Sequence, residues 1–242
     1  NKIDRIRGFG KLISQNEITV LDKDGKKTES ITADNIIIAT GARPKVFPNI
    51  PVDRKNIITS TEAMSLSEQP KELVIIGAGA IGIEFAYFYS VLGTKVTVIE
   101  MMDHILAVED AEVSMALEKN FKKRGIEIYT STMVEKAEVK GKNVIVTINQ
   151  NGQKKELTAD KVLSAIGVTG NVEGFGLEEL DVELFKNHIK VDKKTYQTNV
   201  PNIYAIGDVI GPPWLAHVAS AEGIHCVEGI KGIKNPEVDY EN

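Results

Sequence analysis

Short apolar runs alternate with helical patterns through the middle of the chain. Residues 73–76 are continuously apolar, which is typical of a strand buried on both faces. Residues 95–99 (KVTVI) predict a second such strand. Between them lies a helical pattern that Gly93 would end. Its apolar positions are Ile81, Phe85, Phe88, Tyr89 and Leu92. The order strand, helix, strand predicts a βαβ unit with a parallel sheet.

A second helix–strand pair follows. Residues 110–124 have an amphipathic pattern with Val113, Leu117 and Phe121 on the predicted buried face, and Glu118 and Lys122 form a pair on the opposite face. Gly125 would end this helix, and residues 126–130 predict the next strand. These elements extend the parallel sheet and carry no functional signal of their own.

One hairpin-and-strand pattern occurs twice. EITVLDKDGKK predicts a hairpin with its turn at Asp24-Gly25, and NVIVTINQNGQKK predicts one at Asn151-Gly152. The first is followed by TADNIIIATG at residues 32–41, the second by TADKVLSAIG at residues 158–167. Chance similarity of two amphipathic hairpins is the alternative, but the shared T-A-D and final glycine favour a repeat. A matching glycine turn would then lie about 50 residues before the first residue.

The C-terminal third predicts one more buried strand, at residues 203–206. Gly207 and Asp208 follow at its carboxyl end, where open α/β sheets bind ligands. A double proline then delays the next helix, which begins near Ala216. Asp208 either binds a cofactor hydroxyl or caps the following loop, and the pattern alone leaves both open.

Composition narrows the class of protein. The 242 residues are 42% hydrophobic, as expected for a globular chain, and the net charge of −5 argues against a nucleic-acid partner. Cys226 stands alone, so no intrachain disulfide forms, which fits the reducing cytoplasm. It is expected to be a small core residue. No apolar run has the length of a membrane span. The first residue is Asn1 rather than Met, so we expect a fragment.

The strongest chemical signal is GAGAIG, a G-x-G-x-x-G turn between strand and helix. Gly77 permits the tight turn, Gly79 lets a diphosphate approach the backbone, and Gly82 allows close helix packing. Glu100, at the end of the second strand, is placed to accept bonds from an adenosine ribose. Residues 101–104 contain no arginine, which favours NAD over NADP. The alternative is a glycine-rich turn that binds nothing.

Four motifs resemble one family. They are ATGARP (39–44), GAGAIGIE (77–84), TNVPNIYAIGD (198–208) and WLAHVASAEG (214–223). They resemble the flavoprotein pyridine-nucleotide disulfide oxidoreductases, and AIGD with LAH resembles their dihydrolipoamide dehydrogenase branch. The resemblance implies an α/β fold of two Rossmann-like, three-layer β/β/α units, with an NAD domain inserted in a partial FAD domain.

The resemblance also implies domain limits and site residues. Residues 1–69 would be part of the first FAD segment plus a linker, 70–168 the NAD domain, 169–234 the second FAD segment, and 235–242 the start of a dimerisation domain. For NAD the implied residues are Gly77, Ala78, Gly79, Ala80, Ile81, Gly82, Ile83, Glu84, Glu100, Val134 and Gly167. For FAD they are Gly10, Thr40, Gly41, Ala42, Asp208, Trp214, Leu215, Ala216 and His217.

The chain departs from the family pattern in five respects. The FAD glycine turn, the C-x-x-x-x-C redox-active pair and the His-Glu pair are not in this sequence, so no catalytic residue is assigned. In the family, a lysine near the flavin pairs with the glutamate that corresponds to Glu84, and this lysine is also not in this sequence. Val168 stands where relatives often carry arginine. No metal ligand set is predicted, because His104 and His225 lack suitably spaced partners.

The resemblance implies a homodimeric parent that oxidises dihydrolipoamide, carried on lipoyl domains of 2-oxo acid dehydrogenase complexes. Electrons would pass through a disulfide and FAD to NAD. We expect this chain alone to be inactive, with no nucleic-acid or membrane partner. The alternatives are a non-catalytic NAD-binding module and another enzyme of the superfamily, such as an NADH oxidase or mercuric reductase.

Overall fold

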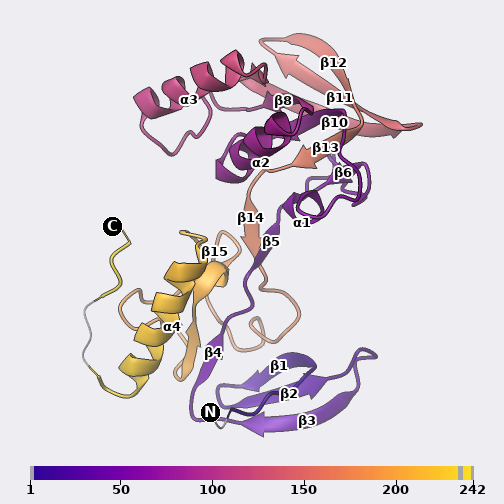
Figure 1. Cartoon of the computed structure of the whole chain (residues 1–242). Helices are drawn as coiled ribbons and strands as arrows, with labels where there is room; N and C mark the ends of the chain where they lie inside the picture. The colour runs from indigo at the N-terminus through magenta and orange to yellow at the C-terminus, as the bar shows by residue number, and fades with distance from the viewer. Residues whose placement is uncertain (1–2, 234–236, 241–242) are drawn as a thin grey trace. The chain divides into compact units, whose positions relative to one another are not determined.

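The structure is a computed structural model that describes residues 3–233 and 237–240. The chain forms two compact units, coloured by residue number in Figure 1. Unit 2 is Pro44–Val168, and unit 1 combines Asn1–Arg43 with Thr169–Asn242.

Unit 2 is built on a five-stranded parallel sheet, which confirms the predicted α/β class. The strand order is β6 (Ile57–Ile58), β13 (Lys161–Ser164), β7 (Glu72–Ile76), β8 (Lys95–Ile99) and β9 (Glu127–Tyr129). The sheet register places Leu73 beside Val96 and Ile75 beside Val98. The apolar runs predicted at residues 73–76 and 95–99 are therefore buried neighbours in the sheet.

The two faces of this sheet are covered by different layers (Figure 1). Leu73 and Ile75 pack on helices α2 (Ala80–Val91) and α3 (Ala111–Lys123). Val74 and Ile76 point to the other face and pack on an antiparallel meander. The meander strands are β10 (Thr132–Lys140), β11 (Asn143–Gln150) and β12 (Gln153–Ala159). Because side chains alternate along a strand, one continuous apolar run serves both layers.

The amphipathic helix has the predicted bounds but not entirely the predicted face. Asp110 caps α3 by accepting a hydrogen bond from Glu112 N–H at 2.8 Å. Phe121 is buried, whereas Val113 is 56% exposed, so its assignment to the buried face is wrong. Ser114 is buried instead, and its hydroxyl donates to Leu106 O at 3.3 Å. The loop before the helix folds under its first turn, and a hydrogen bond rather than apolar contact selects the buried residue there.

Both predicted hairpin turns are present. Asn151 and Gly152 have φ of 53° and 84°, the positive pair that a two-residue turn requires. Gly25 has φ of 77°. Asp22 Oδ1 accepts hydrogen bonds from Asp24 N–H and Lys26 N–H, both at 2.9 Å, and so closes the first turn.

Unit 1 contains a smaller parallel element. β4 (Ile36–Ile38) pairs with β17 (Ile203–Ala205), which is followed by the short 3-10 helix η1 (Gly207–Ile210) and by α4 (Ala216–Ile230). A meander of β1 (Phe9–Ser14), β2 (Glu17–Leu21) and β3 (Lys27–Thr32) and a hairpin of β15 (Leu184–Phe185) and β16 (His188–Ile189) complete the unit. Its single core includes Cys226, buried as predicted.

Four short elements complete the fold, two of them at the boundaries between the units and two within unit 2. β5 (Ala42–Pro44) and β14 (Val168–Gly170) form a two-stranded sheet. β6 pairs with β13, and helix α1 (Ser60–Ala63) begins with a capping box at Thr59 and Glu62. Residues 44–69 therefore fold with unit 2, within the range that the sequence assigned to the first FAD segment and its linker. The domain roles stay a prediction.

Among the described residues, no helix combines the length and apolar character that crossing a bilayer demands.

Candidate functional site

The residues predicted for NAD follow three neighbouring parallel strands of unit 2. Gly77 follows β7, Glu100 follows β8, and Gly167 lies three residues beyond β13. Parallel strands end at the same edge of a sheet, so these residues gather there. Backbone bonds join the strand ends: Gly77 N–H donates to Ile99 O, and Ala165 N–H donates to Ile76 O, each at 2.8 Å.

The turn after β7 tolerates only glycine at two positions. Gly77 has φ of +99°, and a Cβ there would collide with the carbonyl oxygen of Ala165. A Cβ on Gly82 would overlap the carbonyl oxygen of Gly77. The first helical turn of α2 therefore packs directly on the backbone of the preceding strand end, and any side chain at Gly82 would push the helix away.

Gly79 differs from these two glycines because the space around it is open. It is the N-cap of α2, no side chain caps it, and a Cβ built there would meet nothing within 4 Å. The first N–H groups of a helix have no partner within the helix, and the positive end of its dipole lies here. An exposed, uncapped helix start with free space beside it suits a diphosphate.

Glu100 links the turns that follow β7 and β8. Its Oε2 accepts a hydrogen bond from Ala78 N–H at 2.6 Å, and its Oε1 accepts one from Met102 N–H at 2.8 Å. Each carboxylate oxygen has a second lone pair, so Glu100 could also accept bonds from a ribose diol. The carboxylate is thus fixed beside the glycine turn by backbone donors before any ligand binds.

The remaining NAD candidates lie around this edge in different environments. Val134, half-buried in β10 beside a β-bulge, packs on the core below the meander. Gly167 has φ of +100° and accepts a hydrogen bond from Lys45 N–H at 2.9 Å. Glu84 is exposed on α2. Ala78 is buried within the turn, and Ala80, Ile81 and Ile83 belong to the first turns of α2.

Several FAD candidates gather at a corresponding edge of unit 1. β4 and β17 are parallel, and Ile206 N–H donates to Ile38 O at 3.0 Å, so Thr40 and Asp208 follow strand ends on the same side. Asn171 clasps the first of these turns: the Thr40 hydroxyl donates to Asn171 O at 2.8 Å, and Asn171 Nδ2 donates to Thr40 O at 2.9 Å.

The same turn continues into an ion pair. Asn171 N–H donates to Gly41 O at 2.9 Å, and Ala42 begins β5. The Arg43 guanidinium donates to both oxygens of Glu173, at 2.6 and 2.9 Å. The hydrogen bond from Arg43 lowers the pKa of Glu173 below its ordinary value. Both side chains are substantially exposed, so the pair orients the turn more than it stabilises the fold.

The start of α4 is the second part of this region. Asp208 lies in η1, and Leu215 is the N-cap of α4, followed by Ala216 and His217. Trp214 is 44% exposed, and its ring centroid lies 6.0 Å from that of His188. Gly10 does not join this group: it lies within β1 of the meander, opposite Val20.

The sequence analysis missed two residues of unit 1. Glu222 is buried on α4, and its carboxylate accepts a hydrogen bond from Gly207 N–H at 2.7 Å. An acid within an apolar helical stretch was the available signal for it. His188 Nε2 is buried and makes no hydrogen bond within the part of the chain that the structure describes. Nothing in its local sequence distinguishes this histidine.

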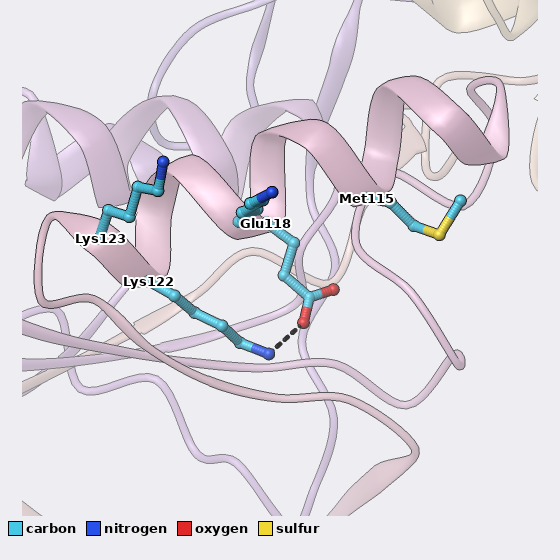
Figure 2. Close-up of a pocket in the computed structure, with 5 residues that line it drawn as sticks. Met115, Glu118, Lys122 and Lys123 are labelled. Atoms are coloured by element: carbon cyan, nitrogen blue, oxygen red, sulfur yellow. Dashed lines mark ion pairs between the residues drawn. The ribbon is translucent and has the colours of Figure 1, made fainter.

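An open depression of about 550 Å³ lies over the exposed face of α3, far along the chain from the glycine turn (Figure 2). Its lining includes the ion pair between Lys122 Nζ and Glu118 Oε1, 2.5 Å apart, which confirms the predicted pair of these two residues. The lining residues are Met115, Glu118, Lys119, Lys122 and Lys123. They all belong to one helix, so no second element converges on a ligand, and we assign no site here.

Within residues 3–233 and 237–240, no three His, Cys, Asp or Glu side chains are grouped so that they could hold a metal ion.

The chain is similar to known proteins of one family. The family model described as pyridine nucleotide-disulphide oxidoreductase matches residues 2–223. Dihydrolipoyl dehydrogenase of Rhizobium etli is 45% identical over 97% of this chain and 52% of its own length. The mitochondrial dihydrolipoyl dehydrogenase of Sus scrofa is 40% identical, over 96% of this chain and 46% of its own. The chain spans about half the length of the curated relatives it matches.

Solved structures give the same result. LpdA from Mycobacterium tuberculosis matches with a TM-score of 0.87 and 31% identity, over 97% of this chain and 51% of its own. The HOCl-induced flavoprotein disulfide reductase RclA from Escherichia coli matches with a TM-score of 0.85 and 25% identity, over 97% and 52%.

Proposed function

The chain belongs to the pyridine nucleotide-disulphide oxidoreductase family, and on this premise we propose that residues 77–84 and Glu100 bind NAD. The dehydrogenases of this family use FAD and NAD, the two cofactors expected from the sequence. The observation that carries the proposal is the open start of α2 at Gly79 with the Glu100 carboxylate fixed beside it. The helix start would hold the diphosphate, and Glu100 the adenosine ribose.

The same geometry supports a preference for NAD over NADP. Glu100 is held in place by two backbone N–H donors, so its charge cannot easily turn away from an incoming ribose. A 2′-phosphate would meet this carboxylate at close range. The next residues are Met101, Met102, Asp103 and His104, which offer no arginine to neutralise a phosphate. Val134 and Gly167 would line the adenine and nicotinamide ends.

In unit 1 we propose part of a flavin site. Thr40, Gly41 and Ala42 would contact FAD through their backbone, Asp208 would bind the ribitol side, and the start of α4 at residues 214–217 would face the flavin ring. The shared edge of β4 and β17 supports this placement of Thr40 and Asp208. Gly10 has the least support, because it lies within a paired strand. When bound, the two cofactors supply two-electron transfer.

We propose that the parent of this chain is a dihydrolipoyl dehydrogenase with NAD, FAD and a redox disulfide. Support comes from relatives of that name at 40–45% identity. Its substrate would be dihydrolipoamide on the lipoyl domains of 2-oxo acid dehydrogenase complexes, and it would be a homodimer. The assignment of residues 70–168 to an NAD domain inserted between two FAD segments, in two Rossmann-like units, belongs to this proposal. A cytoplasmic location is supported by the lone cysteine.

A second candidate is a non-catalytic NAD-binding module. Cys226, the single cysteine, favours this for the chain as it stands. The side chain is fully buried, and burial raises the pKa of its thiol to about 11. A thiol that remains protonated and enclosed is not a redox nucleophile. The chain therefore contributes no thiol for disulfide chemistry, whatever the parent does.

Titration calorimetry with NAD and NADP tests the NAD proposal. We expect NAD to bind more tightly than NADP. Glu100→Ala should weaken NAD binding by about 1–3 kcal/mol, the range for loss of a hydrogen-bonded charged group. Glu109→Ala, which removes a carboxylate elsewhere in unit 2, is the matched control and should leave affinity unchanged. Equal or tighter binding of NADP by the unmodified protein would contradict the proposal.

A further inference from the structure

Unit 1 contains a buried polar cluster centred on Glu222, a residue that no part of the proposed function uses. Glu222 is 2% exposed, so its carboxylate needs partners within the protein. Oε2 accepts a hydrogen bond from Gly207 N–H at 2.7 Å, and Oε1 accepts one from the Tyr240 hydroxyl at 2.8 Å. One carboxylate on α4 thus joins the turn after β17 to the segment Glu237–Tyr240.

Several further contacts hold this segment, residues 237–240, on unit 1. The hydroxyl oxygens of Tyr240 and Tyr196 are 3.0 Å apart, and because Tyr240 donates to Glu222, Tyr196 donates to Tyr240. Lys193 Nζ lies 4.8 Å from the centre of the Tyr240 ring. Lys194 Nζ is 2.8 Å from Glu237 Oε1. Burial first, and then these hydrogen bonds, raise the pKa of the Tyr240 hydroxyl, so it remains a donor.

The other hydrogen bond of Glu222 comes from Gly207, the residue immediately before Asp208. Gly207 has φ of +71°, and a Cβ on it would lie 3.3 Å from Cβ of Ala219 on α4. The turn is therefore tightly packed and in a conformation that depends on glycine. The hydrogen bond from Gly207 N–H to Glu222 holds this turn immediately before Asp208, at the carboxyl end of β17.

We propose that Glu222 is a positioning residue of the flavin site, and that docking of residues 237–240 onto it fixes the turn that presents Asp208. Without the Tyr240 hydroxyl, the buried carboxylate would lose one of its two hydrogen bonds and would be driven toward water. Gly207 would then lose the acceptor for its N–H. This inference rests on the flavin site proposed above.

The test uses the full-length parent with Tyr240→Phe, Glu222→Ala and Glu222→Gln. We expect the first two to raise the dissociation constant of FAD about tenfold, the scale of one lost hydrogen bond to a charged group. They should also speed amide exchange at Gly207 in the flavin-free protein. Glu222→Gln should largely restore both values, because its amide oxygen can accept from Gly207 N–H and its amide nitrogen can donate to the Tyr240 oxygen.

Tyr204→Phe is the matched control, since it removes a phenol hydroxyl from β17 of the same unit, and should change neither value. Tyr240→Phe removes a single atom, so it remains informative where Glu222→Ala does not fold. If the unmodified parent binds FAD and Tyr240→Phe alters neither flavin affinity nor exchange, the inference is overturned. If the unmodified parent does not bind FAD, the proposed function fails. Unchanged Gly207 exchange in Tyr240→Phe then overturns the positioning role separately.

Discussion

The two sheet edges that carry the candidate residues are held by different kinds of contact. In unit 2 the edge is closed by backbone bonds between adjacent strands and by Glu100, which bonds to N–H groups of the two neighbouring turns. In unit 1 the parallel pair β4–β17 also has a backbone bond at its edge, but the turns that follow the two strands are held by the side chains of Asn171 and Glu222. Asn171 lies 131 positions from Thr40, and Glu222 lies 15 positions from Gly207.

The difference indicates how far each edge depends on its surroundings. The edge in unit 2 is built from three adjacent strands, β13, β7 and β8, and its sheet is covered by layers on both faces. It should keep its shape as long as unit 2 is folded. The edge in unit 1 depends on single side-chain hydrogen bonds from Asn171 and Glu222, and the second of these residues is itself held by Tyr240. It should therefore be more sensitive to substitution than the edge in unit 2.

The largest effect expected from this comparison is that the 242-residue chain binds NAD without catalysing dihydrolipoamide oxidation. We expect it to bind NAD but to produce no NADH from dihydrolipoamide and added FAD. The reason is that its one cysteine is buried, so no redox dithiol is available. Both measurements are made on the same sample. Turnover above a no-protein control, once full-length enzyme has been excluded, would show that the chain is catalytic by itself.

Substitution of two glycines of the same turn should have different effects on stability and on NAD binding. Gly82→Ala forces a Cβ onto the Gly77 carbonyl, so we expect loss of NAD binding and about 3 kcal/mol of destabilisation. Gly79→Ala has free space, so the protein should unfold at nearly the same urea concentration while NAD binding weakens. Urea unfolding and calorimetry separate the two. Equal loss of stability in both variants would contradict the free space at Gly79, and unchanged NAD affinity in Gly79→Ala would contradict its role beside the diphosphate.

The sequence analysis was more successful for features set by a short stretch of sequence than for features set by tertiary side-chain contacts. The βαβ unit, the place of Glu100 directly after β8 and the Asn151-Gly152 turn were predictable because each follows from the pattern of a short stretch of sequence. The buried face of α3 was wrong at Val113, since a hydrogen bond from Ser114 to a preceding loop decided it. The clasps made by Asn171 and Glu222 depend on tertiary contacts that no local pattern encodes.

Asp208 offers an intermediate effect that tests the edge in unit 1. In the parent, Asp208→Ala should lower the amount of FAD that survives gel filtration, while NAD binding by unit 2 stays intact. The reason is the position of Asp208 in η1, immediately after the turn held by Glu222. Flavin absorbance per protein is the measurement. Full occupancy in the variant would show that Asp208 only caps the loop.

The smallest effect concerns the exposed pair of Arg43 and Glu173 beside the Asn171 clasp. Arg43 lowers the pKa of Glu173 from its ordinary 4.5, so the pair stabilises the folded state above that pH, and the contribution is lost as pH falls through the lowered value. Glu173→Gln should therefore cost less than about 1 kcal/mol at pH 7, because solvent screens the pair. The cost should shrink in high salt and vanish in acid below the lowered pKa. Urea unfolding at several pH values measures this loss of stability, and Glu178→Gln, which changes a neighbouring acid outside the pair, is the control.

A cost that persists in acid would mean that Glu173 acts through packing or neutral hydrogen bonds. The contacts around the turn at Thr40 would then depend less on the charge of the Arg43–Glu173 pair than the short distance between these side chains indicates.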